Sequence, residues 1–132
     1  RVRDLMGEDA ESLLEHRFAV INVWKPIRGP VEATPLAICD ATSIGAGELV
    51  ATDLVYKDRV GEVQLLAHSP EHRWYYFSRM TRDETLIMKC FDSERDGPAR
   101  FTCHSAFDDP TTREDAPARE SIEVRTLAFF SE

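Results

Sequence analysis

The residues with the clearest chemical potential lie near the end of the chain, between Phe101 and Arg125. This stretch reads as a strand that carries His104, a loop rich in proline, aspartate and threonine, and a strand that opens with Arg-x-Ser at Arg119 and Ser121. Side chains alternate between the two faces of a strand, so Arg119, Ser121 and Arg125 share a face. Paired side by side, the two strands would present an imidazole and one or two guanidiniums to a common cavity. That combination suits a metal ligand next to an anchor for a carboxylate-bearing small molecule.

Each of these residues also has a purely structural interpretation. A lone histidine on a strand is more often structural than catalytic, and Arg119-Glu120-Ser121 could be an exposed strand start. Cys103 and His104 resemble a thiol beside its base, but neighbours on a strand point to opposite faces, which excludes a Cys/His dyad. The three cysteines of the chain lack any C-x-x-C spacing, so a structural zinc site is not indicated.

The aromatic run at 74–77 and Lys89 can each be interpreted as a ligand contact or as a structural feature of a strand. The aromatic run Trp74–Phe77 could stack a ligand, although a strand packed on both faces explains it better. Lys89 lies among apolar residues and could meet a substrate carboxylate. A strand lysine that extends its amine to solvent is an equal alternative.

The surrounding chain predicts mainly β-structure with a short N-terminal helix. Helical spacing of apolar residues, acids in the first turn and bases in the last indicate a helix over Glu8–Arg17. The run Phe18–Trp24 is apolar enough for a strand buried on both faces. Glu84–Phe91 and Ala99–Ala106 have the pattern of a hairpin. Together with the strand at 119–129, they are expected either to pair as consecutive antiparallel partners or to face one another across a jelly-roll cavity. Further strands are expected at Leu36–Cys39, Asp53–Lys57, Gly61–His68, Arg73–Ser78 and Arg119–Phe130. Many short strands with Pro/Gly turns favour an antiparallel sandwich or barrel.

Composition limits the possible partners and compartments. The 132 residues suit a single domain, and 42% hydrophobic content argues against disorder. A net charge of −8 argues against nucleic acid or an anionic membrane as the main partner. No apolar run approaches the ~20 residues that a membrane span needs. An odd number of cysteines without motif spacing suggests a reducing compartment, so we expect a cytoplasmic protein. Composition does not indicate an oligomeric state.

Four segments of the chain resemble one known family, the AsaB/CmcJ-like hydroxylases and desaturases. They are RFAVINVWKPIRGPVEATPLAICDA (Arg17–Ala41), HRWYYFSRM (His72–Met80), MKCFDS (Met88–Ser93) and CHSAFDDPTTREDAPARESIEVR (Cys103–Arg125). The segments occur in the same order as in the family, and the match to which they belong covers nearly the whole chain. NVW-(R/K)-PI and DDPTT…RESIEVR are the specific parts of the match.

The resemblance implies a double-stranded β-helix, or jelly roll, that binds Fe(II) and 2-oxoglutarate. His104 matches the distal iron-binding histidine of the family. Arg119 with Ser121 matches the Arg-x-Ser that holds the 2-oxoglutarate carboxylate, and Arg125 is a second candidate for that role. By the same resemblance, the residues expected to contact substrate are Trp24, Lys25, Trp74, Tyr76 and Lys89.

One part of the family pattern is absent from this sequence. Members use a His-x-Asp pair together with the distal histidine, but His16, His68, His72 and His104 are not followed by Asp or Glu at the second position. A lone imidazole does not hold Fe(II) usefully. The 132 residues are therefore expected to be the C-terminal part, a fragment, of a longer oxygenase of secondary metabolism, and to be inactive alone.

The complete enzyme is expected to couple oxidative decarboxylation of 2-oxoglutarate to hydroxylation or desaturation of a small-molecule substrate. The alternative is a non-catalytic jelly-roll or cupin-like module that binds a small carboxylate, because jelly rolls host many functions. Recovery of a His-x-Asp pair upstream would favour the enzyme.

Overall fold

The protein is built from short β-strands that follow a few helical turns, as seen in a computed structural model that describes residues 1–97 and 99–131. The N-terminal turns are α1 (Val2–Met6), η1 (Gly7–Asp9) and α2 (Ala10–Leu14). The predicted helix over Glu8–Arg17 is therefore present but shorter. Gly7 has a φ of 54°, a conformation that glycine adopts readily, and it ends α1.

The described residues form eight strands, and several coincide with the predicted ones. β2 (Leu36–Cys39) matches its prediction, and β1 extends its predicted run by two residues to Pro26. A one-turn helix, η2 (Ala41–Ser43), follows β2. The remaining strands are β3 (Leu49–Val55), β4 (Val60–Leu66), β5 (Trp74–Tyr76), β6 (Leu86–Asp92), β7 (His104–Ala106) and β8 (Ser121–Phe129), with β1 spanning Phe18–Pro26.

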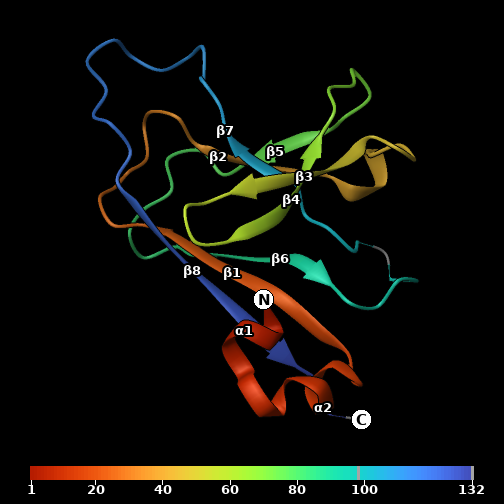
Figure 1. Cartoon of the computed structure of the whole chain (residues 1–132). Helices are drawn as coiled ribbons and strands as arrows, with labels where there is room; N and C mark the ends of the chain where they lie inside the picture. The colour runs from red at the N-terminus through yellow and green to blue at the C-terminus, as the bar shows by residue number, and fades with distance from the viewer. Residues whose placement is uncertain (98, 132) are drawn as a thin grey trace.

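The strands form two three-stranded antiparallel sheets and one separate hairpin (Figure 1). The first sheet has the order β6-β1-β8, and the second has the order β5-β2-β7. The chain passes from β1 to the second sheet, returns at β6, crosses again at β7 and ends in the first sheet at β8. This alternation between two sheets is typical of a jelly roll, and the mainly-β fold prediction is confirmed.

Strand register determines which side chains face the space between the sheets. On β1, Asn22 and Trp24 are buried; Asn22 lies opposite Met88 on one side and Arg125 on the other. Directly opposed residues of antiparallel strands project from the same face of the sheet. The buried core lies between the sheets, so this is the inner face. Its main core residues are Trp24, Val31, Leu36, Met80 and Met88, with Ile38, Leu86 and Cys90 packed against them.

The predicted hairpin between 84–91 and 99–106 is wrong in its pairing. β6 pairs with β1, and β7 pairs with β2 in the other sheet. The two segments meet where β6 ends: Phe91 and Phe101 form an isolated bridge, and the Thr102 hydroxyl donates to the Lys89 carbonyl at 2.8 Å. Beyond it the chain leaves for the second sheet, because a jelly roll places consecutive strands on opposite layers.

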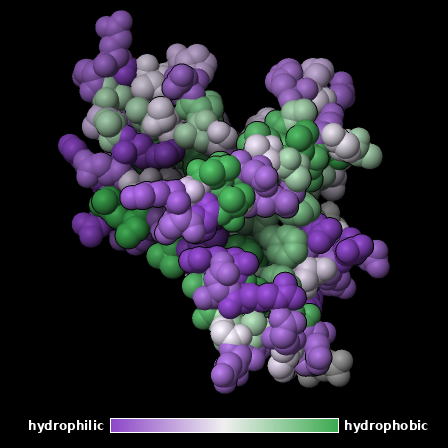
Figure 2. Space-filling view, viewed as in Figure 1, coloured by the Kyte–Doolittle hydropathy of each residue, from purple (hydrophilic) through white to green (hydrophobic). Residues whose placement is uncertain are grey.

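Within the part of the chain that the structure describes, the hairpin of β3 and β4 is not hydrogen-bonded into either main sheet, and it exposes apolar side chains. One of its faces carries Val50 and Leu54 on β3 and Leu65 on β4, each at least 40% exposed. Hydrophobic residues surround a hollow near the middle of the surface shown in Figure 2, between this hairpin and β6. None of the helices among the described residues is long and apolar enough to cross a membrane.

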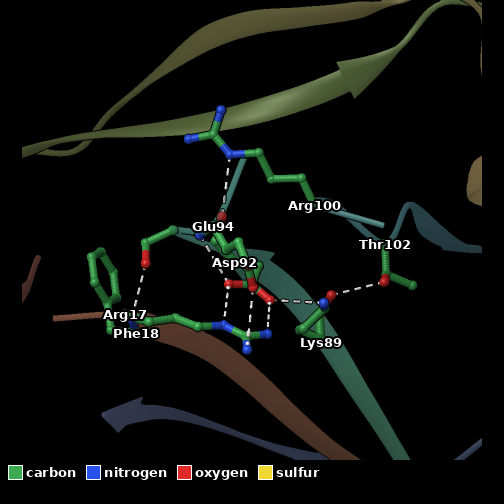
Figure 3. Close-up of polar contacts among 8 residues, drawn as sticks. Arg17, Phe18, Lys89, Asp92, Glu94, Arg100 and Thr102 are labelled. Atoms are coloured by element: carbon green, nitrogen blue, oxygen red, sulfur yellow. Dashed lines mark hydrogen bonds and ion pairs between the residues drawn. The ribbon is translucent and has the colours of Figure 1, made fainter. Parts of the chain in front are cut away.

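A buried carboxylate holds the first sheet to the N-terminal segment (Figure 3). The side chain of Asp92 is 2% exposed and accepts two hydrogen bonds from Arg17, at 3.1 and 2.7 Å, and one from Lys89 at 2.8 Å. The backbone N–H of Glu94 adds a further bond at 3.1 Å. These donors, Arg17 first and Lys89 next, hold the pKa of Asp92 well below its usual range, although burial opposes them.

We predict that Asp92→Asn lowers the free energy of unfolding by about 3 kcal/mol at neutral pH. The change removes the buried negative charge that pairs with both Arg17 and Lys89. The lowered pKa stabilises the fold fully above the unfolded-state pKa of about 4, and this contribution is lost as pH falls below it. Urea denaturation from pH 7 to pH 2 should therefore show a constant gap between wild type and variant above about pH 5 and a gap that narrows progressively below about pH 4. Asp53→Asn, at an exposed position of β3, is the control and should change little. A gap that is as large at pH 2 as at pH 7 would contradict the assignment.

Candidate functional site

The candidate site lies where the inner faces of the two sheets meet. His104 opens β7 and is directly opposite Ile38 of β2. Ile38 packs against the core cluster, so the register places His104 on the inner face of its sheet. Cys103 precedes it on the other face, as predicted from strand alternation.

His104 is oriented in a way that suits a metal ligand. Its Nδ1 lies 3.0 Å from the carbonyl oxygen of Thr102. A carbonyl only accepts, so Nδ1 must carry the proton and donate. In the neutral ring this leaves the Nε2 lone pair free. A donor bond from the second nitrogen is the usual support of a metal-binding imidazole.

Arg119 reaches the same core cluster from the opposite sheet. It lies just before β8 rather than within it, which differs from the predicted strand start. Its Nη1 donates to the carbonyl oxygen of Thr34 at 2.6 Å, and its guanidinium carbon lies 5.6 Å from the ring centre of Trp24. Within the described residues it forms no ion pair with a carboxylate, so its remaining N–H groups are free to meet an anion.

Arg125 is on the inner face with Ser121 but is already paired. Its Nε donates to Asn22 Oδ1 at 3.1 Å, and its Nη2 lies 3.5 Å from Glu123 Oε1. Asn22 Nδ2 donates to the same Glu123 oxygen at 2.7 Å. The Asn22 amide is fully buried and bridges the two charged side chains. Ser121 begins β8 opposite Pro26, two residues after Arg119.

The chain by itself does not provide a complete metal site. Among residues 1–97 and 99–131, no group of three His, Cys, Asp or Glu side chains converges where it could hold a metal ion. His104 fits one ligand position by its inner-face placement and its protonated Nδ1. Burial raises the pKa of the Cys90 and Cys103 thiols, and the neighbouring Cys39 adds to this for Cys103. Protonated thiols are poor metal ligands.

The structure separates the predicted substrate contacts. Trp24 lies on the inner face with the core, whereas Lys25 is its neighbour on β1 and points to the outer face. Trp74 and Tyr76 are opposite Cys39 and Ala37, on the outer face of the second sheet and away from His104. Lys89 is bonded to Asp92. A role in substrate contact stays a prediction for these residues, and only Trp24 lies beside the candidate site.

Asn22 and Glu123 were not predicted as site residues, yet they line the inner face. The signal for Asn22 was available, because it is the only polar residue in the run Phe18–Trp24 that was expected to be buried. A buried amide needs hydrogen-bond partners, and here β8 supplies them. Glu123 had no local signal, since an alternating strand places charged residues on one face in any case.

Comparison with known proteins places this geometry among oxidoreductases. A protein-family model described as "Oxidoreductase/YMDC permease-like domain" matches residues 1–129. The chain is 38% identical to aspirochlorine biosynthesis protein N of Aspergillus oryzae, covering 98% of this chain and 56% of the relative. It is 39% identical to hydroxylase/desaturase asaB of Aspergillus flavus, covering 94% and 60%. It is 42% identical to the Fe(II)/2-oxoglutarate-dependent dioxygenase nvfI of Aspergillus novofumigatus, covering 95% and 45%.

A solved structure has the same fold. The iron and alpha-ketoglutarate-dependent endoperoxidase NvfI superposes with a TM-score of 0.88 at 38% identity, over 99% of this chain and 49% of that one. The chain thus spans about half the length of the curated relatives and of the structure that it matches.

We predict that Asn22→Asp lowers the free energy of unfolding by about 2 kcal/mol. The change is nearly isosteric, but it replaces the amide donor that faces Glu123 with an acceptor and adds a like charge. Thermal or urea denaturation at neutral pH measures the effect. Thr126→Ala removes an exposed hydroxyl from the same strand pair and should stay within about 0.5 kcal/mol of wild type. An equal decrease in the free energy of unfolding for the two variants would show that the Asn22 amide between Glu123 and Arg125 does not stabilise the fold specifically.

Proposed function

We propose that this chain, which belongs to the Oxidoreductase/YMDC permease-like domain family, forms half of a non-haem Fe(II)/2-oxoglutarate-dependent oxygenase. The resemblance to AsaB/CmcJ-like hydroxylases and desaturases is confirmed by the 39% identity to hydroxylase/desaturase asaB. Its part would be to supply one iron ligand, the 2-oxoglutarate anchor and one wall of the substrate cavity. The reaction would be hydroxylation or desaturation of a small molecule of secondary metabolism. The names of the relatives support this class of chemistry.

The observation that carries the proposal is the orientation of His104. The Thr102 carbonyl fixes the proton on Nδ1, so Nε2 would bind the metal from the inner face of β7. A purely structural histidine would satisfy both nitrogens within the protein or with solvent. The jelly-roll module without catalysis remains the alternative, and it predicts no dependence of iron binding on His104.

Arg119 suits the 2-oxoglutarate anchor better than Arg125 does. A guanidinium binds a carboxylate with two parallel hydrogen bonds, which requires free N–H groups on one edge. Arg119 donates one N–H to the Thr34 carbonyl, and its guanidinium lies over the ring of Trp24. These two contacts fix the plane of the guanidinium. Arg125 is compensated by Glu123, whose negative charge would repel a second carboxylate. Ser121 lies on the same strand end and would add a hydroxyl donor.

When bound, iron and 2-oxoglutarate would supply the oxidising chemistry, and the residues of this chain would position the reactants. Arg119 and Ser121 would orient the cosubstrate. Trp24, Met88 and Leu86 form an apolar inner wall that would exclude water from the reacting centre. The remaining iron ligands would come from sequence outside these 132 residues, because the described residues do not converge on a second ligand set. We further propose a cytoplasmic location, on the composition of the chain.

We predict that His104→Ala in the full-length enzyme reduces iron-dependent 2-oxoglutarate turnover by about 100-fold or more, because it removes one protein ligand of the iron. Fe(II) affinity should fall in parallel, as measured by isothermal titration under nitrogen. The matched control is His68→Ala, which alters an exposed histidine of the same chain. Unchanged Fe(II) affinity in His104→Ala would remove His104 from the metal site and favour the non-catalytic module.

We predict that Arg119→Ala raises the 2-oxoglutarate concentration for half-maximal turnover by about 10- to 100-fold, since charge-assisted hydrogen bonds contribute about 1.5–3 kcal/mol. Fe(II) affinity should stay close to wild type. The comparison variant is Arg125→Ala, which should have a smaller effect on 2-oxoglutarate because Arg125 is paired with Glu123. Arg28→Ala, at an exposed ion pair with Glu120, is the neutral control. A larger effect at Arg125 than at Arg119 would reverse the assignment.

A further inference from the structure

Two cysteines far apart in sequence are direct neighbours across β2 and β7. Cys39 ends β2, and its backbone N–H donates to the carbonyl oxygen of Cys103 at 2.8 Å. The pair continues the register in which Ile38 is opposite His104. Both thiols are free.

The Cα spacing expected from the register of this pair lies within the range of disulfide-bonded cysteines. In an antiparallel ladder, hydrogen-bonded pairs alternate with non-hydrogen-bonded pairs. Phe107 donates to the Pro35 carbonyl, so 35 and 107, then 37 and 105, then 39 and 103 are the hydrogen-bonded pairs. Such pairs have Cα atoms about 5.5 Å apart. The Cα atoms of disulfide-bonded cysteines are usually about 5.5–6 Å apart.

The two thiols also point to the same side, away from the candidate site. Because Ile38 and His104 occupy the inner face, Cys39 and Cys103 occupy the outer face. Cys39 is buried at 2% exposure, whereas Cys103 is partly exposed. The third cysteine, Cys90, lies on β6 in the other sheet and packs against the core. It therefore provides an internal control for any thiol chemistry.

We propose that Cys39 and Cys103 form a reversible interstrand disulfide when the protein meets a low-molecular-weight disulfide. The Cys103 thiolate attacks one sulfur of the reagent and releases one thiol, which leaves a mixed disulfide on Cys103. The Cys39 thiolate then attacks the Cys103 sulfur and displaces the second thiol. The two cysteines lose two protons and two electrons in total, and the reagent is reduced to two thiols.

The disulfide would join the start of β7, which carries His104, to β2, the central strand of the same sheet. β7 has three residues and lies at the edge of the β5-β2-β7 sheet as described. Cys103 immediately precedes His104, so the bond would restrain the start of β7 and the turn that holds the imidazole. It would also close a loop of over sixty residues in the unfolded chain, from Cys39 to Cys103, which raises stability. The disulfide chemistry stands independently of the proposed iron site.

The test is disulfide mapping on the full-length protein. The reduced protein is incubated with oxidised glutathione, free thiols are alkylated, and tryptic peptides are analysed by mass spectrometry. Cys39, Cys90 and Cys103 fall in three different tryptic peptides, residues 29–57, 90–95 and 101–113. We expect peptide 29–57 joined to peptide 101–113 as the main product, reversed by dithiothreitol. The product should persist in Cys90→Ser and vanish in Cys103→Ser.

A second measurement tests the effect on the fold. The oxidised protein should unfold at a Tm about 5 °C or more above that of the reduced protein, and Cys103→Ser should show no such shift. The proposal is overturned if Cys103 carries only glutathione, if peptide 90–95 joins either partner to a similar extent, or if the linked product forms faster in urea-unfolded protein. An unchanged Tm in the fully linked protein would overturn the restraint on β7. Fe(II) binding enters neither readout, so failure here is distinguishable from failure of the proposed function.

Discussion

The buried Asp92 carboxylate is the interaction on which the arrangement of the first sheet depends. It joins Arg17, at the entry to β1, with Lys89 on β6, and it lies beside a register irregularity between Val20 and Ile21. A register slip of one residue would exchange the inner and outer faces of a strand. Holding the start of β1 against the end of β6 therefore decides that Trp24 and Met88 face the core. A buried carboxylate without these cations would be strongly destabilising. Registers of β1 and β6 that separate Asp92 from Arg17 and Lys89 are therefore disfavoured.

Once β1 is held, its second neighbour follows. β8 pairs with β1 along its full length, from Phe129 opposite Phe18 to Ser121 opposite Pro26. This pairing brings Glu123 and Arg125 to the buried Asn22 amide and leaves Arg119 beyond the strand end, beside Trp24. The two arginines of the RESIEVR segment thus acquire different electrostatic surroundings from one register. One is neutralised by a carboxylate and the other is available to an anion.

The second sheet contributes through the two faces of the chain at the start of β7. The inner face carries His104, and the outer face carries Cys103 beside Cys39. The proposed metal ligand and the thiol pair are therefore adjacent in sequence but lie on opposite faces of the strand. The same alternation removes Trp74 and Tyr76 from the surroundings of His104, although all of these residues belong to one sheet.

The sequence by itself determined the mainly-β class, the positions of most strands, and the separation of Cys103 from His104, because these follow from local periodicity and turn residues. The run Phe18–Trp24 and the short strand Leu36–Cys39 were predictable for that reason. Strand partners were not: the hairpin expected between 84–91 and 99–106 is replaced by pairing to β1 and β2, which are distant in sequence. Pairing is decided by which apolar faces can be buried together, and only the tertiary structure settles that. The environment of Arg119 was equally out of reach, since its partner Thr34 meets it only through that packing. Arg125 and Lys89 have partners close in sequence, Glu123 and Asp92, but their further links to Asn22 and, through Asp92, to Arg17 also depend on the packing.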